Sequence, residues 1–187
     1  MNGKSILLII LLIAISSAGC SQGLVKDIYS HARSGDDSQT ATAFVALSNM
    51  SLTKKEIERI DNDYKTERNE RRHYYYEFLL AKRTQEKRYI DAFIDNSDRN
   101  FSVLVENKTN WISIVSPFYK QISLYGKTND KALTVLFKLS KIADGATLEV
   151  ITADLSGIRK IDPKRFWEVA KDNGFQKKEL LKLMEDE

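Results

Sequence analysis

Few side chains in this sequence have the types and the spacing that a catalytic or metal site requires. His31 and His73 lie in different segments, and neither has a second His or Cys at the spacing of metal ligands. Pairs such as Glu149 and Asp154 have the chemistry of glycoside hydrolysis, but with 26 acidic residues such pairs arise by chance. A Ser-His-Asp triad can assemble from distant segments, although no local motif indicates one. The sequence therefore predicts no metal site and no cofactor, and it favours a non-enzymatic protein.

The segment Gly126-Lys127-Thr128 has the ending of a phosphate-binding loop. That motif requires another glycine five residues before the first one, where this chain has Gln121, and it follows a strand. A glycine at this place instead predicts the residue that stops a helix.

The charge pattern argues against a nucleic-acid partner. The formal net charge is +3, and basic and acidic side chains alternate in nearly equal number between Lys54 and Arg99. Because nucleic acids bind to surfaces of one sign through the release of counterions, such a mixed pattern offers little affinity.

The first nineteen residues have the three zones of a secretory signal peptide. Lys4 gives a positive start, an unbroken apolar run covers Ile6 to Ile15, and small residues from Ser16 to Gly19 lead to Cys20. Ten residues of helix rise about 15 Å, which is half of a hydrocarbon core of about 30 Å. Residues 1–19 are therefore expected to be a leader rather than a spanning helix.

The segment Ser17-Ala18-Gly19-Cys20 resembles the lipobox of bacterial lipoproteins, with Ser17 where that family favours Leu. The resemblance implies that the Cys20 thiol carries diacylglycerol, that the leader is cut before it, and that acyl chains such as palmitate hold the protein to a membrane. Ser21 follows, where Asp tends to retain such lipoproteins in the inner membrane. The resemblance thus implies the outer membrane, on its periplasmic or its surface face.

Cys20 is the only cysteine, so no internal disulfide can form. An unpaired thiol outside the cytoplasm is reactive, and a thioether to lipid removes it. Residues 20–37 are expected to be the lipidated N-terminus and a short tether. Leu24 to Arg33 has helical spacing within it: either this segment packs on the domain and the body sits against the bilayer, or it floats and reaches at most about 55 Å.

Start and stop signals of helices recur along the rest of the chain. A capping box spans Thr53 to Glu56, and Ser116-Pro117 and Asp162-Pro163 are cap residues followed by proline at the first helical position. Only 8 Gly and 2 Pro occur, which favours helices over sheets. Phe101 to Glu106 has strand-like alternation but is expected to be helical. The prediction is an all-α protein: one domain over residues 38–187, folded as an array or irregular bundle of about eight to ten short antiparallel helices.

The ends of the later helices are expected at glycines. Gly126, Gly145, Gly157 and Asn173-Gly174 each follow a segment with helical spacing of apolar residues.

Three consecutive tyrosines lie in the most apolar helical stretch. Because successive helix positions turn by about 100°, Tyr74, Tyr75 and Tyr76 cover most of the circumference. Either other helices surround this one, with the hydroxyls at the rim of the core, or at least one ring is exposed. In the second case the three tyrosines, together with Trp111, are the candidate residues of an aromatic binding surface.

These observations favour a lipid-anchored envelope protein whose helical domain binds another protein or acts as a scaffold. One version is an immunity or inhibitor protein that neutralises an envelope-acting toxin. The alternative is an envelope hydrolase that acts on peptidoglycan or lipid, with carboxylates or a serine in a cleft. The sequence leaves the partner and the oligomeric state open.

Overall fold

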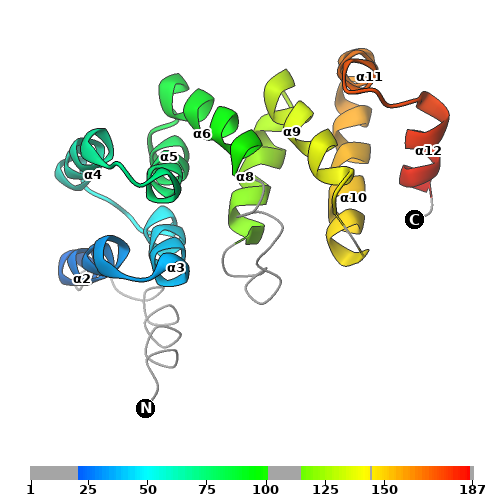
Figure 1. Cartoon of the computed structure of the whole chain (residues 1–187). Coiled ribbons are helices and arrows are strands. Elements are labelled where there is room, and N and C mark those ends of the chain that lie inside the picture. The colour runs from blue at the N-terminus through cyan, green and yellow to red at the C-terminus, as the bar shows by residue number, and fades with distance from the viewer. Residues whose placement is uncertain (1–20, 101–114, 144, 186–187) are drawn as a thin grey trace. The chain divides into compact units, whose positions relative to one another are not determined.

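The protein is all-α. The computed structural model describes residues 21–100, 115–143 and 145–185, and no strand occurs in these ranges. The helices, shown in Figure 1, are α2 (Ser21–Ser34), α3 (Asp37–Asn49), α4 (Lys54–Thr66), α5 (Glu70–Thr84), α6 (Lys87–Arg99), α8 (Ser116–Gly126), α9 (Asp130–Ser140), α10 (Gly145–Ile161), α11 (Pro163–Asp172) and α12 (Lys177–Glu185). The predicted fold class, an array of short helices, is confirmed.

The chain divides into two compact units, with the boundary between Phe93 and Ile94 inside α6. The sequence predicts a single domain that starts at residue 38. Hydrophobic periodicity identifies helices but does not reveal which of them share a core, so the number of domains stays a prediction.

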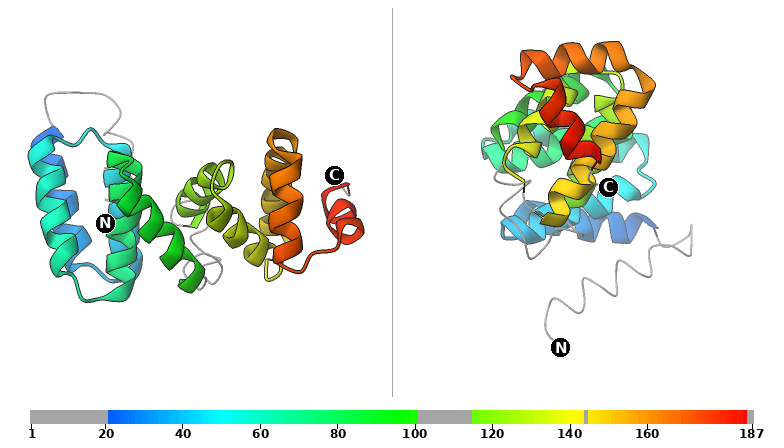
Figure 2. Two further views of the ribbon diagram at one scale, coloured as in Figure 1. Left: turned by 90° about the horizontal axis from the view of Figure 1, so that it is seen from above. Right: turned by 90° about the vertical axis from the view of Figure 1, so that its right-hand side faces the viewer.

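The first unit consists of two helical hairpins, one stacked on the other. Helices α2 and α3 form one hairpin and α4 and α5 form the next, and α3 packs against α5. Figure 1 and the left view of Figure 2 both show α4 beside α2 and α5 beside α3. Contact between helices one hairpin apart is the stacking principle of helical-repeat proteins.

Helix α2 belongs to this unit and is not a floating tether. Its apolar stripe, Val25, Ile28, Tyr29 and Ala32, is at most 8% exposed. Of the two alternatives for residues 24–33, the structure has the packed one. Burying this stripe against α3 is favourable, so residues 21–34 are part of the first unit.

The second unit repeats the stacking with later helices. Helices α8 and α9 form one hairpin and α10 and α11 form the next, with α9 against α11, while α10 also contacts α9 and α12. An aromatic cluster fills its centre. The ring centroid of Phe137 lies 5.2 Å from that of Phe166 and 5.1 Å from that of Phe175.

Several predicted helix ends are confirmed. Thr53 and Glu56 form the capping box, and the Asp162 side chain accepts a hydrogen bond from the Arg165 N–H ahead of Pro163. Asn173 is the C-cap of α11, and Gly174 follows with a φ of 76°. Glycine is favoured at position 174 because it adopts this left-handed conformation without the steric cost of a side chain.

Four predicted ends are wrong. Gly145 is the first residue of α10, while α9 already ends at Ser140. Ser116 is the first residue of α8 rather than its cap, since Val115 precedes it in helical conformation and no side chain caps this end. Gly126 is the last residue of α8 rather than the residue after it. Helix α10 continues through Gly157 to Ile161, because one more helical turn buries Ile158 against the core, which is favourable. The prediction for Phe101 to Glu106 lies outside the described residues.

Candidate functional site

The three consecutive tyrosines form the centre of the first unit. Tyr74, Tyr75 and Tyr76 are 0%, 1% and 2% exposed. Tyr74 stacks on Phe93 at 5.3 Å between centroids, and Tyr76 meets the edge of Phe44 at 4.7 Å. Other helices therefore cover α5 at these three positions, and the rings form no exposed aromatic surface. Cys20 and Trp111, the other predicted site residues, lie outside the described residues.

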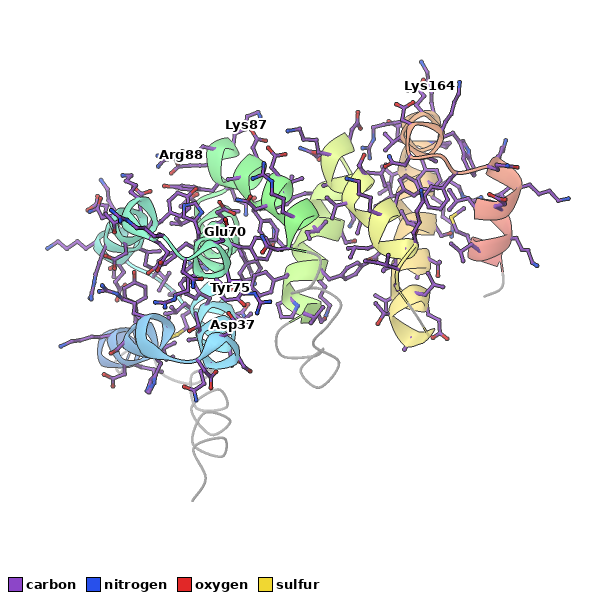
Figure 3. All side chains as sticks on the ribbon, in the orientation of Figure 1. Asp37, Glu70, Tyr75, Lys87, Arg88 and Lys164 are labelled. Carbon is purple, nitrogen blue, oxygen red and sulfur yellow. The ribbon has the colours of Figure 1, made fainter. Side chains whose placement is uncertain are left out.

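The tyrosine hydroxyls reach carboxylates at the rim of the core. Tyr75 donates to Asp37 Oδ1 at 3.1 Å, and Figure 3 shows these two side chains side by side, from α5 and the start of α3. Tyr29 donates to Asp63 Oδ2 at 2.6 Å, and its oxygen lies 3.2 Å from that of Tyr76. Each phenol thus satisfies its polar end while its ring is buried.

The same pairing recurs between other helices. Tyr119 of α8 donates to Asp154 of α10 at 2.7 Å, and Tyr89 of α6 donates to Asp61 of α4. Burial, followed by the hydrogen bond to the carboxylate, raises the pKa of Tyr29, Tyr89 and Tyr119. These bonds join one helix to another.

A serine and a lysine also lie together, and the sequence analysis did not find them. Lys82 Nζ lies 3.2 Å from Ser48 Oγ and 2.8 Å from Asn49 Oδ1, at the end of α3. Burial, and to a lesser extent the charge of Arg83, lowers the pKa of Lys82. A lysine with a lowered pKa beside a serine has the composition of a Ser-Lys hydrolase dyad.

The geometry of this pair does not suit catalysis. The Ser48 hydroxyl donates to the Val45 carbonyl at 2.7 Å, so its proton points away from the amine that would have to accept it. Ser48 is also only 1% exposed and cannot meet a substrate. The lysine instead donates to groups at the C-terminus of α3, where a positive charge is favourable.

A histidine-carboxylate pair lies one helical turn apart on α5. His73 Nδ1 is 3.0 Å from Glu77 Oε1, and the Tyr64 ring lies 4.3 Å from the imidazole. Glu77 is 1% exposed. The imidazole thus lies between the Glu77 carboxylate and the Tyr64 ring, and it satisfies a buried carboxylate.

The second unit has a cavity of about 410 Å³ between α6 and α9. Its charged lining consists of Asp95, Arg99, Asp130 and Lys131. Lys131 bonds to Asp95 at 2.8 Å, and Asp130 is bound by Arg165 at 2.9 Å. Since both carboxylates already have cationic partners, the cavity offers no pair of carboxylates arranged as acid and base.

The exposed aliphatic side chains are concentrated in the second unit. Leu124, Ile142, Val150 and Ile161 are the large hydrophobic residues exposed among those the structure describes, at 51%, 53%, 42% and 61%. Two of them, Val150 and Ile161, lie on α10. The sequence analysis missed them because they lie outside the stripe of α10 that packs on the core.

Comparison with known proteins gives no relative: no family model, no curated protein and no solved structure matches this chain. Within the described ranges, no helix is long and apolar enough to cross a bilayer. The same ranges contain no group of three or more metal-ligating side chains.

Proposed function

We propose that this protein is a lipoprotein of the cell envelope, anchored through Cys20, whose helical body binds another envelope protein. The observation that carries the binding half is the exposure of Leu124 and Ile142, both of which lie in the second unit. Exposed apolar groups in a monomer commonly mark protein-binding sites when they gather on one part of the surface.

The anchoring half of the proposal rests on the leader and on its junction with the fold. Cys20 immediately precedes Ser21, the first residue of α2. Helix α2 is fixed to its unit by its buried stripe and by the bond from Tyr29 to Asp63. If Cys20 carries acyl chains, no linker residues separate the lipidated residue from α2, so the first unit would lie directly against the bilayer surface.

The binding half rests on the residues left free for a partner. Leu124 of α8 and Ile142, which follows α9, are more than half exposed, although water is an unfavourable environment for them. An immunity or inhibitor protein is one form of such a binder. The hydrolase alternative has its best candidate in Ser48 and Lys82, which are unsuited to catalysis by burial and by the direction of the serine proton.

The anchor is tested by replacing Cys20 with serine in a bacterial host that processes lipoproteins. We expect the unchanged protein to incorporate labelled palmitate and to sediment with membranes, and Cys20→Ser to lose both properties. Palmitate incorporation by the serine variant, or unchanged membrane fractionation without any label, would refute lipidation at this residue.

The binding surface is tested by placing a photo-crosslinking amino acid at single exposed positions in the anchored protein. We expect crosslinks to a different envelope protein from Leu124 or Ile142 and none from Glu58, an exposed position on α4. Reconstitution with the purified partner should reproduce the crosslink, and Leu124→Glu should abolish the crosslink made from position 142. Equal crosslinking from Glu58 would show that these side chains are not a specific surface.

A further inference from the structure

Helix α10 has a second apolar face, opposite the one that packs on the core. Ile151, Leu155 and Ile158 are buried at 1% or less. The positions on the other side are exposed and uncharged along the whole helix. They are Ala146, Val150, Ala153, Gly157 and Ile161, which we call the outer face of α10.

The spacing of the outer face makes it continuous. Its residues follow one another at intervals of three or four, which places them within about 80° of the helix circumference. No atom lies within 4 Å of where a Cβ would be on Gly157. With Ala153 one turn earlier, this leaves a shallow middle between the larger side chains of Val150 and Ile161, where another helix could approach closely.

The order of residues on this face is symmetric about the level of Leu155. Val150 and Ile161 lie at nearly equal distances on either side, and so do Ala153 and Gly157. In an antiparallel pair of identical helices, each member of such a pair meets the other member on the opposite copy. The large side chains then meet each other at both ends, and the small ones meet in the middle.

The charges beside the face obey the same symmetry. Glu149 and Lys160 lie on the same edge of the outer face, again nearly equidistant from Leu155. Neither has an ion-pair partner among the described residues. Under a two-fold axis perpendicular to both helices, residues on one edge face the same edge of the copy. Glu149 of each copy would therefore lie beside Lys160 of the other.

We propose that the outer face of α10 is a self-association surface, on which a second copy of this chain docks with its own α10 antiparallel. A foreign partner would not require the face to be complementary to itself, whereas a second copy does, and the placement of Glu149 and Lys160 meets that requirement. A single helix pair buries little area, so the dimer is weak in solution. Molecules confined to one membrane by the proposed anchor would meet at a higher effective concentration.

The test is charge reversal in the full chain, purified in a non-ionic detergent and followed by sedimentation equilibrium over a wide range of protein concentrations. Glu149→Lys and Lys160→Glu should each raise the dissociation constant of the dimer roughly tenfold, because each brings like charges together. The double reversal should restore it. Lys178→Glu, an exposed change on α12, should have no effect.

The register is tested by disulfide crosslinking in a Cys20→Ser background. A mixture of Ala153→Cys and Gly157→Cys chains should crosslink faster than either chain alone, since these positions face each other only in the antiparallel pair. Circular dichroism checks that each variant is folded. A monomer at every concentration, a double reversal no better than the single ones, or faster crosslinking between identical positions would overturn the proposal. None of these outcomes depends on lipidation or on a foreign partner.

Discussion

At the scale of single residues, two helical glycines have opposite reasons for being glycine. A Cβ on Gly126 would lie 2.9 Å from Leu136 Cδ1 and 3.3 Å from Ile158 Cδ1, so the end of α8 is packed tightly into the second unit. A Cβ on Gly157 would meet nothing within 4 Å. The first glycine permits close packing within its unit, whereas the second relieves no crowding within a single chain and weakens its helix.

Alanine at these two positions should therefore change stability in opposite directions. Gly126→Ala should lower the free energy of unfolding by about 1 kcal/mol, because crowding outweighs the gain in helix propensity. Gly157→Ala should raise it by about 0.5–1 kcal/mol. Urea denaturation of both variants under one condition measures the contrast, and equal effects would contradict the packing described for Gly126.

Arg165 holds together the start of α9, the end of α8 and the start of α11. Its guanidinium donates to the carbonyls of Gly126 and Lys127 at 2.8 and 2.7 Å, and to Asp130 at 2.9 Å. The side chain is 17% exposed. One cation thus satisfies carbonyls that the end of α8 leaves without helical partners.

Arg165→Ala should destabilise the protein by about 2–3 kcal/mol, since it leaves these carbonyls and Asp130 without their charged donor. Arg165→Lys should recover part of the loss, because an ammonium cannot reproduce the fork of bonds. Thermal and urea unfolding measure both variants, with the more exposed Lys164→Ala as the control. A loss no greater than that of the control would show that these bonds contribute little.

At the scale of elements, the two predicted serine or threonine caps differ in structure. The Thr53 hydroxyl accepts from the Glu56 N–H at 3.3 Å, and Glu56 accepts from the Thr53 N–H at 2.6 Å. Helix α8 has no side-chain cap, since the helical conformation already includes Val115. Similar sequence signals thus lead to different helix starts, because the chain before the signal also contributes.

Thr53→Ala should cost about 1 kcal/mol of stability by removing the capping box. Ser116→Ala should change stability by less than about 0.5 kcal/mol, because Ser116 caps nothing. Equilibrium denaturation tests the pair, and a cost at Ser116 equal to that at Thr53 would contradict the described start of α8.

At the scale of the whole molecule, tyrosine-carboxylate bonds join helices in both units. Burial, followed by the Glu77 carboxylate, raises the pKa of Tyr64 to about 12. Burial and Asp37 raise the pKa of Tyr75, and burial and Asp154 raise that of Tyr119. The unfolded chain releases these protons near pH 10, while the folded chain keeps them. Rising pH therefore favours unfolding.

We expect stability to be unaffected by these groups below about pH 10 and to fall above it. Each tyrosine that keeps its proton contributes a slope of up to about 1.4 kcal/mol per pH unit. Urea denaturation at several alkaline pH values measures the slope, and Tyr119→Phe should make it shallower. A stability that stays constant between about pH 10 and about pH 11 would contradict the raised pKa values.

The sequence by itself determined the helical class and many helix limits. Local features suffice for these: the capping box at Thr53, the cap at Asp162 and the left-handed Gly174 depend on neighbours within a few residues. The leader and Cys20 stay predictions on the same local grounds.

Only the tertiary structure decided which apolar residues are covered. Tyr74, Tyr75 and Tyr76 could be core or surface until the packing of other helices around α5 buried all three. Val150 and Ile161 look like ordinary core residues in sequence, yet α10 turns them outward. Burial depends on which helices become neighbours, and these contacts join residues far apart in the chain, so no local pattern specifies them.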